Sequence, residues 1–127
     1  MNEIDISIIM IDGSFREKFH SLEFFANQDF PRERYELIWV EYFQDTNAKL
    51  KEALEVHPGF RVVCLGKSGT YHSSFCFNQG IREARGRLIV IPDADIVVEP
   101  HFLSELWRRF EENPEIATYI HRFDEPE

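Results

Sequence analysis

The sequence has few cysteines and no long apolar segment. Cys64 and Cys76 are the only cysteines among 127 residues, and both lie within apolar stretches. We therefore expect two buried, reduced thiols, with one disulfide as the alternative. No apolar run approaches the roughly 18 residues that a membrane-spanning helix needs, and the acidic start, Met-Asn-Glu-Ile-Asp, does not follow the signal-peptide pattern. These absences predict a cytoplasmic protein without an integral membrane segment.

Positive charge is also scarce. The chain has 14 Lys and Arg residues against 23 Asp and Glu residues, which gives a formal net charge of −9. A nucleic-acid partner is not expected, because binding to nucleic acid requires a basic face. An anionic ligand would be held only if a metal ion or local cationic groups offset the negative field.

The chain does contain a regular alternation of strand-like and helix-like segments. Strands are predicted where short runs are apolar and rich in β-branched or aromatic residues, at 4–11, 35–43, 60–65, 87–92 and, more briefly, 116–120. Helices are predicted from helical apolar spacing and flanking caps or prolines, at 14–28, between Asp45 and His57, around 77–84 and from Glu99-Pro100 to Asn113. This order predicts a single α/β domain over residues 1–127, with a Rossmann-like, mostly parallel sheet and helices on both faces.

Polar residues follow several of the predicted strands. Asp12 and Glu41 come after the first two strands, Lys67 lies in the loop 66–70 after the third, and Asp93 and Asp95 follow the fourth. In parallel sheets of this type, ligands bind beyond the carboxyl ends of the strands. These residues, which are far apart in the sequence, are therefore predicted to share one rim of the sheet.

The segment Asp93-Ala94-Asp95 is the strongest candidate for a metal site. In an extended stretch, residues two apart point to the same side, about 6 to 7 Å apart at their Cα atoms. Two carboxylates in this arrangement suit Mg²⁺ or Mn²⁺ that also takes phosphate oxygens. The alternative is that Asp93 caps the following turn and Asp95 is only solvated.

The stretch FNQGIREARGRLIVIPDAD at 77–95 resembles the nucleotide-sugar-binding half of an inverting GT-A glycosyltransferase of the family 2 type. The stretches ISIIMI and QDFPRERYELIWVE also resemble that family, so the likeness covers nearly the whole chain. The positions that carry the most specific match are Asn78, Gly80, Ala84, Gly86, Asp93 and Asp95.

This resemblance implies that a nucleoside-diphosphate sugar binds across the strand ends. The Asp95 position would bind the metal that bridges the diphosphate, and the Asp93 position would contact the ribose or the sugar. Glu41 lies where the family has an aspartate that recognises the nucleobase, and Lys67 would approach the base or the phosphates. For Glu41 and Lys67 the alternative is a solvated side chain. Gly80 is expected to permit close packing of a helix on a strand.

The sequence also departs from the family pattern. Met10 to Gly13 replaces the usual Pro-Thr-Tyr-Asn, and Glu41 to Gln44 replaces the common Asp-Asp-Gly-Ser. No residue matches the catalytic base, which the family carries in its acceptor-binding half. Two functions therefore stay open: the donor-binding portion of a glycosyltransferase that acts on an unknown acceptor, or a catalytically inactive domain that binds a nucleotide sugar or a protein.

A homodimer is expected because a partial sheet leaves an edge or a helix face uncovered. The surfaces expected to be shared are the Phe-rich first helix and an apolar stripe on the last one. Their residues are Phe15, Phe19, Phe24 and Phe25, and then Leu103, Leu106, Trp107 and Phe110.

Overall fold

The computed structural model describes residues 3–12, 19–43 and 48–115. Within them the elements follow the predicted alternation. They are β1 (Ile6–Asp12), α1 (His20–Ala26), the 3-10 turn η1 (Arg32–Arg34), β2 (Tyr35–Glu41), α2 (Ala48–Glu55), β3 (Phe60–Cys64), α3 (Ser73–Glu83), β4 (Leu88–Val90) and α4 (Phe102–Glu112). The predicted strand at 116–120, the start of the first predicted helix and the Asp45 cap lie outside the described residues.

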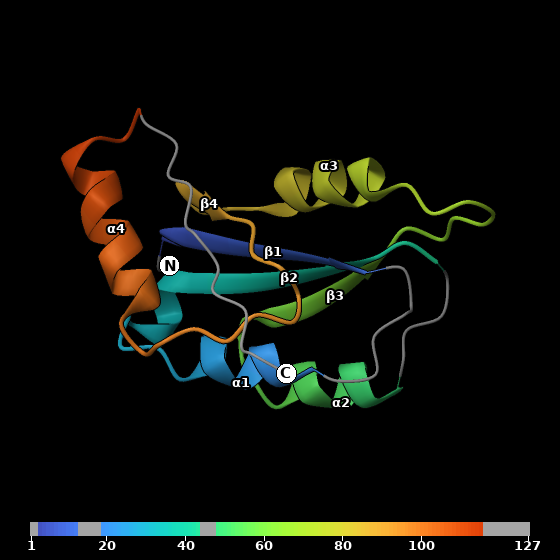
Figure 1. The fold of residues 1–127 in the computed structure, drawn as a ribbon, viewed down its shortest axis with the longest axis horizontal. Coiled ribbons are helices and arrows are strands. Elements are labelled where there is room, and N and C mark those ends of the chain that lie inside the picture. The colour runs from blue at the N-terminus through green and yellow to red at the C-terminus, as the bar shows by residue number, and fades with distance from the viewer. Residues whose placement is uncertain (1–2, 13–18, 44–47, 116–127) are drawn as a thin grey trace, which may run out of the picture.

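The four strands form one parallel sheet in the order β3-β2-β1-β4. Figure 1 shows α1 and α2 below this sheet, α3 above it and α4 beside the ends at which the strands begin. The α/β fold with helices on both faces is therefore confirmed. The central strands β1 and β2 are buried along nearly their whole length, which explains why their sequences are almost continuously apolar.

Residues of β1 and β2 alternate between two apolar clusters, one on each face of the sheet. The larger cluster packs Ile8, Met10 and Trp39 against α1, α2 and α4, and the smaller one packs Ile9 and Val40 against α3. The α4 residues Leu103 and Trp107 are buried in the larger cluster, and Leu106 and Phe110 pack against it. The stripe that we expected to be shared in a dimer is thus covered by the chain's own core.

β4 is shorter than predicted, with three paired residues instead of the stretch 87–92. It pairs with β1 only from Ile6↔Leu88 to Ile8↔Val90. Pro92 lacks the N–H that a longer ladder would use, and the chain leaves the sheet in a loop that crosses the front of Figure 1 on its way to α4. This early exit separates Asp93 and Asp95 from the sheet itself.

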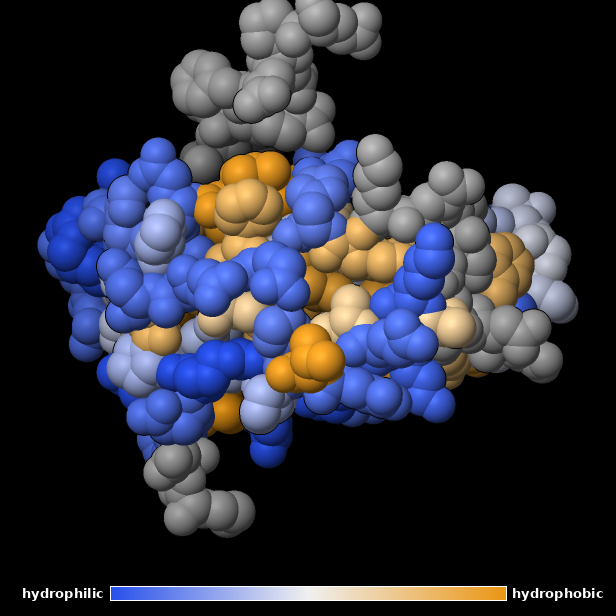
Figure 2. Space-filling view, turned by 90° about the horizontal axis from the view of Figure 1, so that it is seen from below, coloured by the Kyte–Doolittle hydropathy of each residue, from blue (hydrophilic) through white to orange (hydrophobic). Residues whose placement is uncertain are grey.

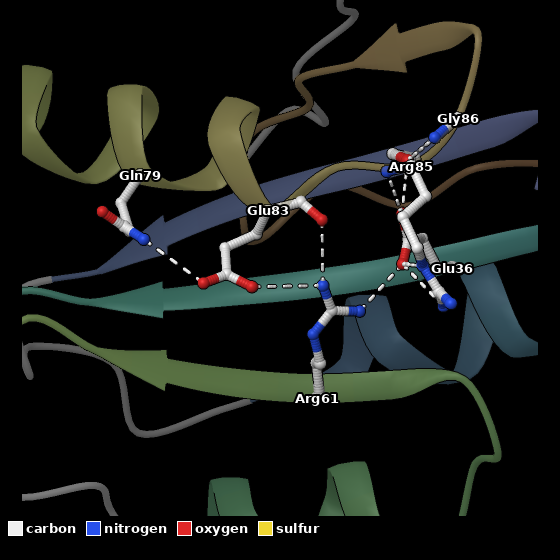
Figure 3. Close-up of polar contacts among 7 residues, drawn as sticks. Glu36, Arg61, Gln79, Glu83, Arg85 and Gly86 are labelled. Atoms are coloured by element: carbon white, nitrogen blue, oxygen red, sulfur yellow. Dashed lines mark hydrogen bonds and ion pairs between the residues drawn. The ribbon is translucent and has the colours of Figure 1, made fainter.

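A buried carboxylate fastens the turn before β4 to the sheet. Glu36 is 0% exposed. It accepts hydrogen bonds from the Ser7 hydroxyl at 2.6 Å, from Arg61 at 2.8 Å and from the Arg85 amide at 2.8 Å. Figure 3 shows Glu36 between the Arg61 and Arg85 side chains, and Arg61 continues to Glu83 at the end of α3. The network joins β1, β2, β3, α3 and the start of β4.

Two glycines allow the chain to approach the sheet closely. A Cβ at Gly80 of α3 would lie 2.5 Å from Cγ2 of Ile9, and a Cβ at Gly86 would lie 2.6 Å from the backbone nitrogen of Ser7. Both distances are shorter than real Cβ contacts, so any side chain would push α3 or the turn before β4 away from β1. The expected role of Gly80 in helix–strand packing is confirmed.

Candidate functional site

The carboxyl ends of β1 and β2 carry two buried acids. Asp12 and Glu41 are neighbours in the register of the two strands. Asp12 is 3% exposed and Glu41 is 1% exposed. The structure therefore brings these predicted residues together, and the alternative of a solvated Glu41 is wrong. Burial restricts the position of these two side chains, so that in their ionised form they present fixed acceptor oxygens at the strand ends.

Tyr71, just before α3, and Cys76, within it, lie close to these acids. The sequence predicts Cys76 only as a buried thiol, and it does not predict Tyr71 as a site residue. Burial raises the pKa of Tyr71 to about 12, with contributions from Cys76, Asp12 and Glu41. Burial and the nearby Glu41 carboxylate raise the pKa of Cys76 to about 11. Both groups are thus neutral near pH 7, and Cys76 is an unreactive thiol. Tyr71 could have been found from its place before a helix that begins at the carboxyl edge of the sheet.

Both cysteines are reduced, as expected. Cys76 is buried, whereas Cys64 is exposed at the end of β3. The prediction of two buried thiols is therefore correct only for Cys76. Cys64 is the last residue of β3, the outermost strand on its side of the described sheet, and its side chain is exposed there.

Asp93 and Asp95 lie in the loop after β4, on the other side of β1. Their side chains are exposed, whereas Ala94 between them is 4% exposed and belongs to the large apolar cluster. Ala94 anchors the segment inward, and both carboxylates are exposed. The segment is a turn and not the extended stretch from which the i, i+2 argument predicted that the two side chains share one side. The turn runs from Asp93 to Ile96, with the Ile96 amide 3.3 Å from the Asp93 carbonyl, so Ala94 and Asp95 are its central residues.

Residues of α1 and the turn that follows hold this loop along its length. The Ser21 hydroxyl donates to the Ala94 carbonyl at 2.6 Å, and His20 Nε2 donates to the Asp95 carbonyl at 2.9 Å. Further along, the Gln28 amide group donates to the Glu99 carbonyl at 2.8 Å and accepts from the Leu103 amide at 2.9 Å. The Asp-Ala-Asp segment is therefore fixed by side chains about 75 residues earlier in the chain.

Lys67 lies in the loop between β3 and α3, at the opposite side of the rim from Asp93 and Asp95. Its amide donates to the Tyr42 carbonyl at 3.0 Å, which ties the loop to the end of β2. Its Nζ lies 4.9 Å from the centre of the Phe75 ring. The side chain is exposed, and its ammonium group lies over an aromatic face, which is a favourable cation–π contact.

The donor set at Asp93 and Asp95 fits a particular kind of metal site. Carboxylate oxygens are hard ligands that suit Mg²⁺ or Mn²⁺. Among the described residues, no group of three or more His, Cys, Asp or Glu side chains is placed to hold a metal ion. The pair thus fits a cation whose other ligands come from a bound diphosphate and water, and it does not fit a metal held by protein ligands alone.

Comparison with known proteins identifies the family. The sequence profile of Glycosyl transferase family 2 matches residues 20–127, and the chain belongs to that family. A comparison with curated proteins found no significant match. Within the part of the chain that the structure describes, no helix has the length and apolar character needed to cross a membrane.

Solved structures share the fold. S. aureus TarS matches with a TM-score of 0.74 at 19% identity, covering 86% of this chain and 20% of TarS. TarS 1-349 in complex with UDP-GlcNAc matches with a TM-score of 0.72 at 21% identity, over 87% of this chain and 32% of that one. The mannosyltransferase PcManGT from Pyrobaculum calidifontis, in complex with GDP-Man and Mn²⁺, matches with a TM-score of 0.59 at 20% identity, over 76% of this chain and 29% of that one. The chain therefore spans between a fifth and a third of the length of these structures.

Proposed function

We propose that this chain is the donor-binding part of a glycosyltransferase. It binds a nucleoside-diphosphate sugar across the carboxyl ends of β1, β2 and β4, for transfer of the sugar to an acceptor of unknown chemistry. The observation that carries the proposal is the exposed Asp93 and Asp95 pair on a buried Ala94 anchor. It is supported by the ligands of similar structures, UDP-GlcNAc for TarS 1-349 and GDP-Man with Mn²⁺ for PcManGT.

In this proposal each predicted residue has a role. Asp95 binds Mg²⁺ or Mn²⁺, and Asp93 binds the ribose or the sugar side of the donor. Asp12 and Glu41 act as fixed acceptors at the floor of the nucleobase end, and Lys67 approaches the base or the phosphates from the loop between β3 and α3. When bound, the metal neutralises charge on the diphosphate, which is the leaving group of the transfer.

The proposal is confined to donor binding. Transfer to an acceptor hydroxyl also needs a positioned proton acceptor, and we assign none of the described residues to that step. The cytoplasmic location and the homodimer expected from the sequence stay predictions. The competing function is a catalytically inactive domain of the same fold that binds a nucleotide sugar or a protein partner.

Isothermal titration calorimetry tests donor binding. UDP and GDP are titrated separately into the protein with Mn²⁺, with Mg²⁺ or with EDTA. Because the chain carries a net charge of −9, the affinity for at least one of these nucleotides should fall by about tenfold or more in EDTA, equivalent to about 1.4 kcal/mol. Equal affinity in metal and in EDTA would contradict the metal role. Absence of binding under every condition would favour the protein-interaction domain.

A further inference from the structure

We propose that Ser21 and His20 are positioning residues for the metal-binding pair. This inference rests on the proposed function, because it concerns the same Asp93-Ala94-Asp95 segment. Neither residue touches a carboxylate of the pair through the hydrogen bonds described above. They act on the two backbone carbonyls between and after the carboxylates, and so they set the orientation of the segment that presents both.

The contact made by Ser21 is short and fully enclosed. Ser21 is 0% exposed, and its hydroxyl lies 2.6 Å from the carbonyl oxygen of the nearly buried Ala94. A buried carbonyl that loses its donor is left without the water that would satisfy it at the surface. Without the Ser21 hydroxyl, the segment would either rotate toward solvent or keep a buried carbonyl with no hydrogen bond. Either response displaces the neighbouring carboxylates.

His20 adds a second point of attachment one residue further along. Its Nε2 lies 2.9 Å from the carbonyl oxygen of Asp95, at the exposed edge of the same loop. Two consecutive residues of α1 thus fix two consecutive carbonyls of the loop. With both peptide planes fixed, the Cα–Cβ bond of Asp95 has a defined direction before any metal arrives, which is the preorganisation that a weak two-ligand site needs.

Ser21 also links the metal segment to the strand that carries Asp12. Its hydroxyl lies 3.9 Å from the sulfur of Met10, two residues before Asp12 in β1. The same side chain therefore contacts the β1 strand and the Asp-Ala-Asp loop. The hydrogen bonds from Ser21 and His20 to the loop, called the brace below, therefore lie between the proposed nucleobase end and the proposed diphosphate end of the site. Through them α1 keeps the two ends at a constant spacing.

The alternative is that these hydrogen bonds only stabilise the fold, and three variants separate the two possibilities. Ser21→Ala removes the buried brace. His20→Ala removes the exposed one and, being at the surface, keeps a folded protein available if Ser21→Ala folds poorly. Ser104→Ala is the matched control. The Ser104 hydroxyl also donates to a residue near α1, Asp29, at 2.8 Å, but Ser104 lies in α4, beyond the loop that contains Asp95.

Two measurements are made on each variant. Free Mn²⁺ is followed by electron paramagnetic resonance in the presence of the nucleoside diphosphate that binds the wild type more tightly. Ser21→Ala should weaken Mn²⁺ binding by about tenfold or more, the scale seen when groups that orient metal ligands are removed, and His20→Ala should weaken it by a smaller factor. Hydrogen exchange should quicken at amides 94–97 in both variants but not in β1 or β2.

The outcomes are distinguishable. If both brace variants keep the Mn²⁺ affinity of the wild type, or if Ser104→Ala weakens it equally, the positioning role is refuted. If the wild type itself shows no metal-dependent binding, the proposed function fails, and hydrogen exchange alone decides whether α1 orders the segment. Unchanged exchange at 94–97 in both variants would overturn the brace in that case as well.

Discussion

At the scale of single residues, the buried Glu36 is the most consequential charge outside the candidate site. Burial alone would raise the pKa of this carboxyl, but hydrogen bonds from Ser7, Arg61 and the Arg85 amide outweigh burial and lower the pKa. The carboxylate therefore stabilises the fold when it is ionised. Because it holds the turn before β4, it also fixes where the chain leaves the sheet toward Asp93.

Replacement of Glu36 should reveal this contribution through its pH dependence. Glu36→Gln keeps the shape but leaves Arg61 and Arg85 beside a neutral amide, and we expect a loss of about 1.5–3 kcal/mol in the free energy of unfolding at pH 7. A lowered folded-state pKa gives stability that is present above the unfolded value of 4.5 and lost as the pH falls through the folded value. The difference between wild type and variant in urea unfolding should thus shrink below about pH 4.5.

Glu105→Gln is the control for that experiment. A hydrogen bond from Arg108 lowers the pKa of Glu105 to about 2, yet this ion pair lies on the surface of α4 and is screened by water. The same substitution should therefore change the free energy of unfolding much less than Glu36→Gln does. Equal effects of the two substitutions on the free energy of unfolding would contradict a special contribution of the buried network to stability.

At the scale of elements, α3 and the turn before β4 both approach β1 closely. We therefore expect Gly→Ala substitutions at the two contacts to reduce stability by different amounts. Gly80→Ala meets the Cγ2 methyl of the buried Ile9 side chain, which can move aside only by repacking, and we expect a loss of about 1–3 kcal/mol in stability. Gly86→Ala meets the backbone of Ile6 and Ser7, which cannot move aside, so its loss should be larger. Thermal or urea unfolding measures both, with Ser74→Ala on the exposed side of α3 as the control. A smaller loss for Gly86→Ala than for Gly80→Ala would contradict this packing.

Most elements could be predicted from the sequence because their signals are local. The apolar runs of β1 and β2 and the helical spacing of Leu103 and Trp107 each lie within about ten residues. The start of α4 was predicted at Glu99-Pro100, but the helix begins at Phe102. The Glu99 carbonyl is held by Gln28 and accepts from the Phe102 amide in a turn, and a contact across 71 residues leaves no local signal.

The site could be predicted only in part, for the same reason. The place of Asp93 and Asp95 after a buried strand could be predicted from a local strand signal, but the turn that they form could not, because the predicted strand was longer than β4. The partners of the segment, Ser21 and His20, are ordinary helix residues in the sequence and gain their role from the packing of α1. The burial of Glu41 was missed because a polar residue at the end of a strand has no local mark of burial.

At the scale of the whole molecule, self-association stays a prediction, and fewer of the residues expected to be shared are exposed. The α4 stripe is part of the chain's own core, and Phe25 is buried as well. Phe24 of α1 is 39% exposed and Val56 after α2 is 68% exposed. Figure 2 shows apolar surface in the middle of the face that carries these helices, bordered by hydrophilic residues.

Light scattering coupled to size exclusion measures the mass in solution. We expect a homodimer at micromolar concentration, with twice the chain mass of 15.1 kDa. It would form through the α1 face or through the edge of β4 with which no described strand pairs. Phe24→Glu should shift the mass toward the monomer if the α1 face is shared, because it buries a charge in the interface. A mass of 15.1 kDa for the wild type would contradict self-association.

Donor binding as proposed depends most on Asp95, which would hold the cation for a nucleoside diphosphate. The direct measurement is calorimetric titration of the diphosphate into Asp95→Asn in saturating Mn²⁺, beside Asp29→Asn, which removes one exposed acid that accepts a hydrogen bond from Ser104 and is not a member of the pair. The account predicts that Asp95→Asn binds only as weakly as the wild type does in EDTA, while Asp29→Asn keeps the wild-type affinity. An Asp95→Asn protein that is folded and binds the diphosphate in Mn²⁺ as tightly as the wild type would contradict it.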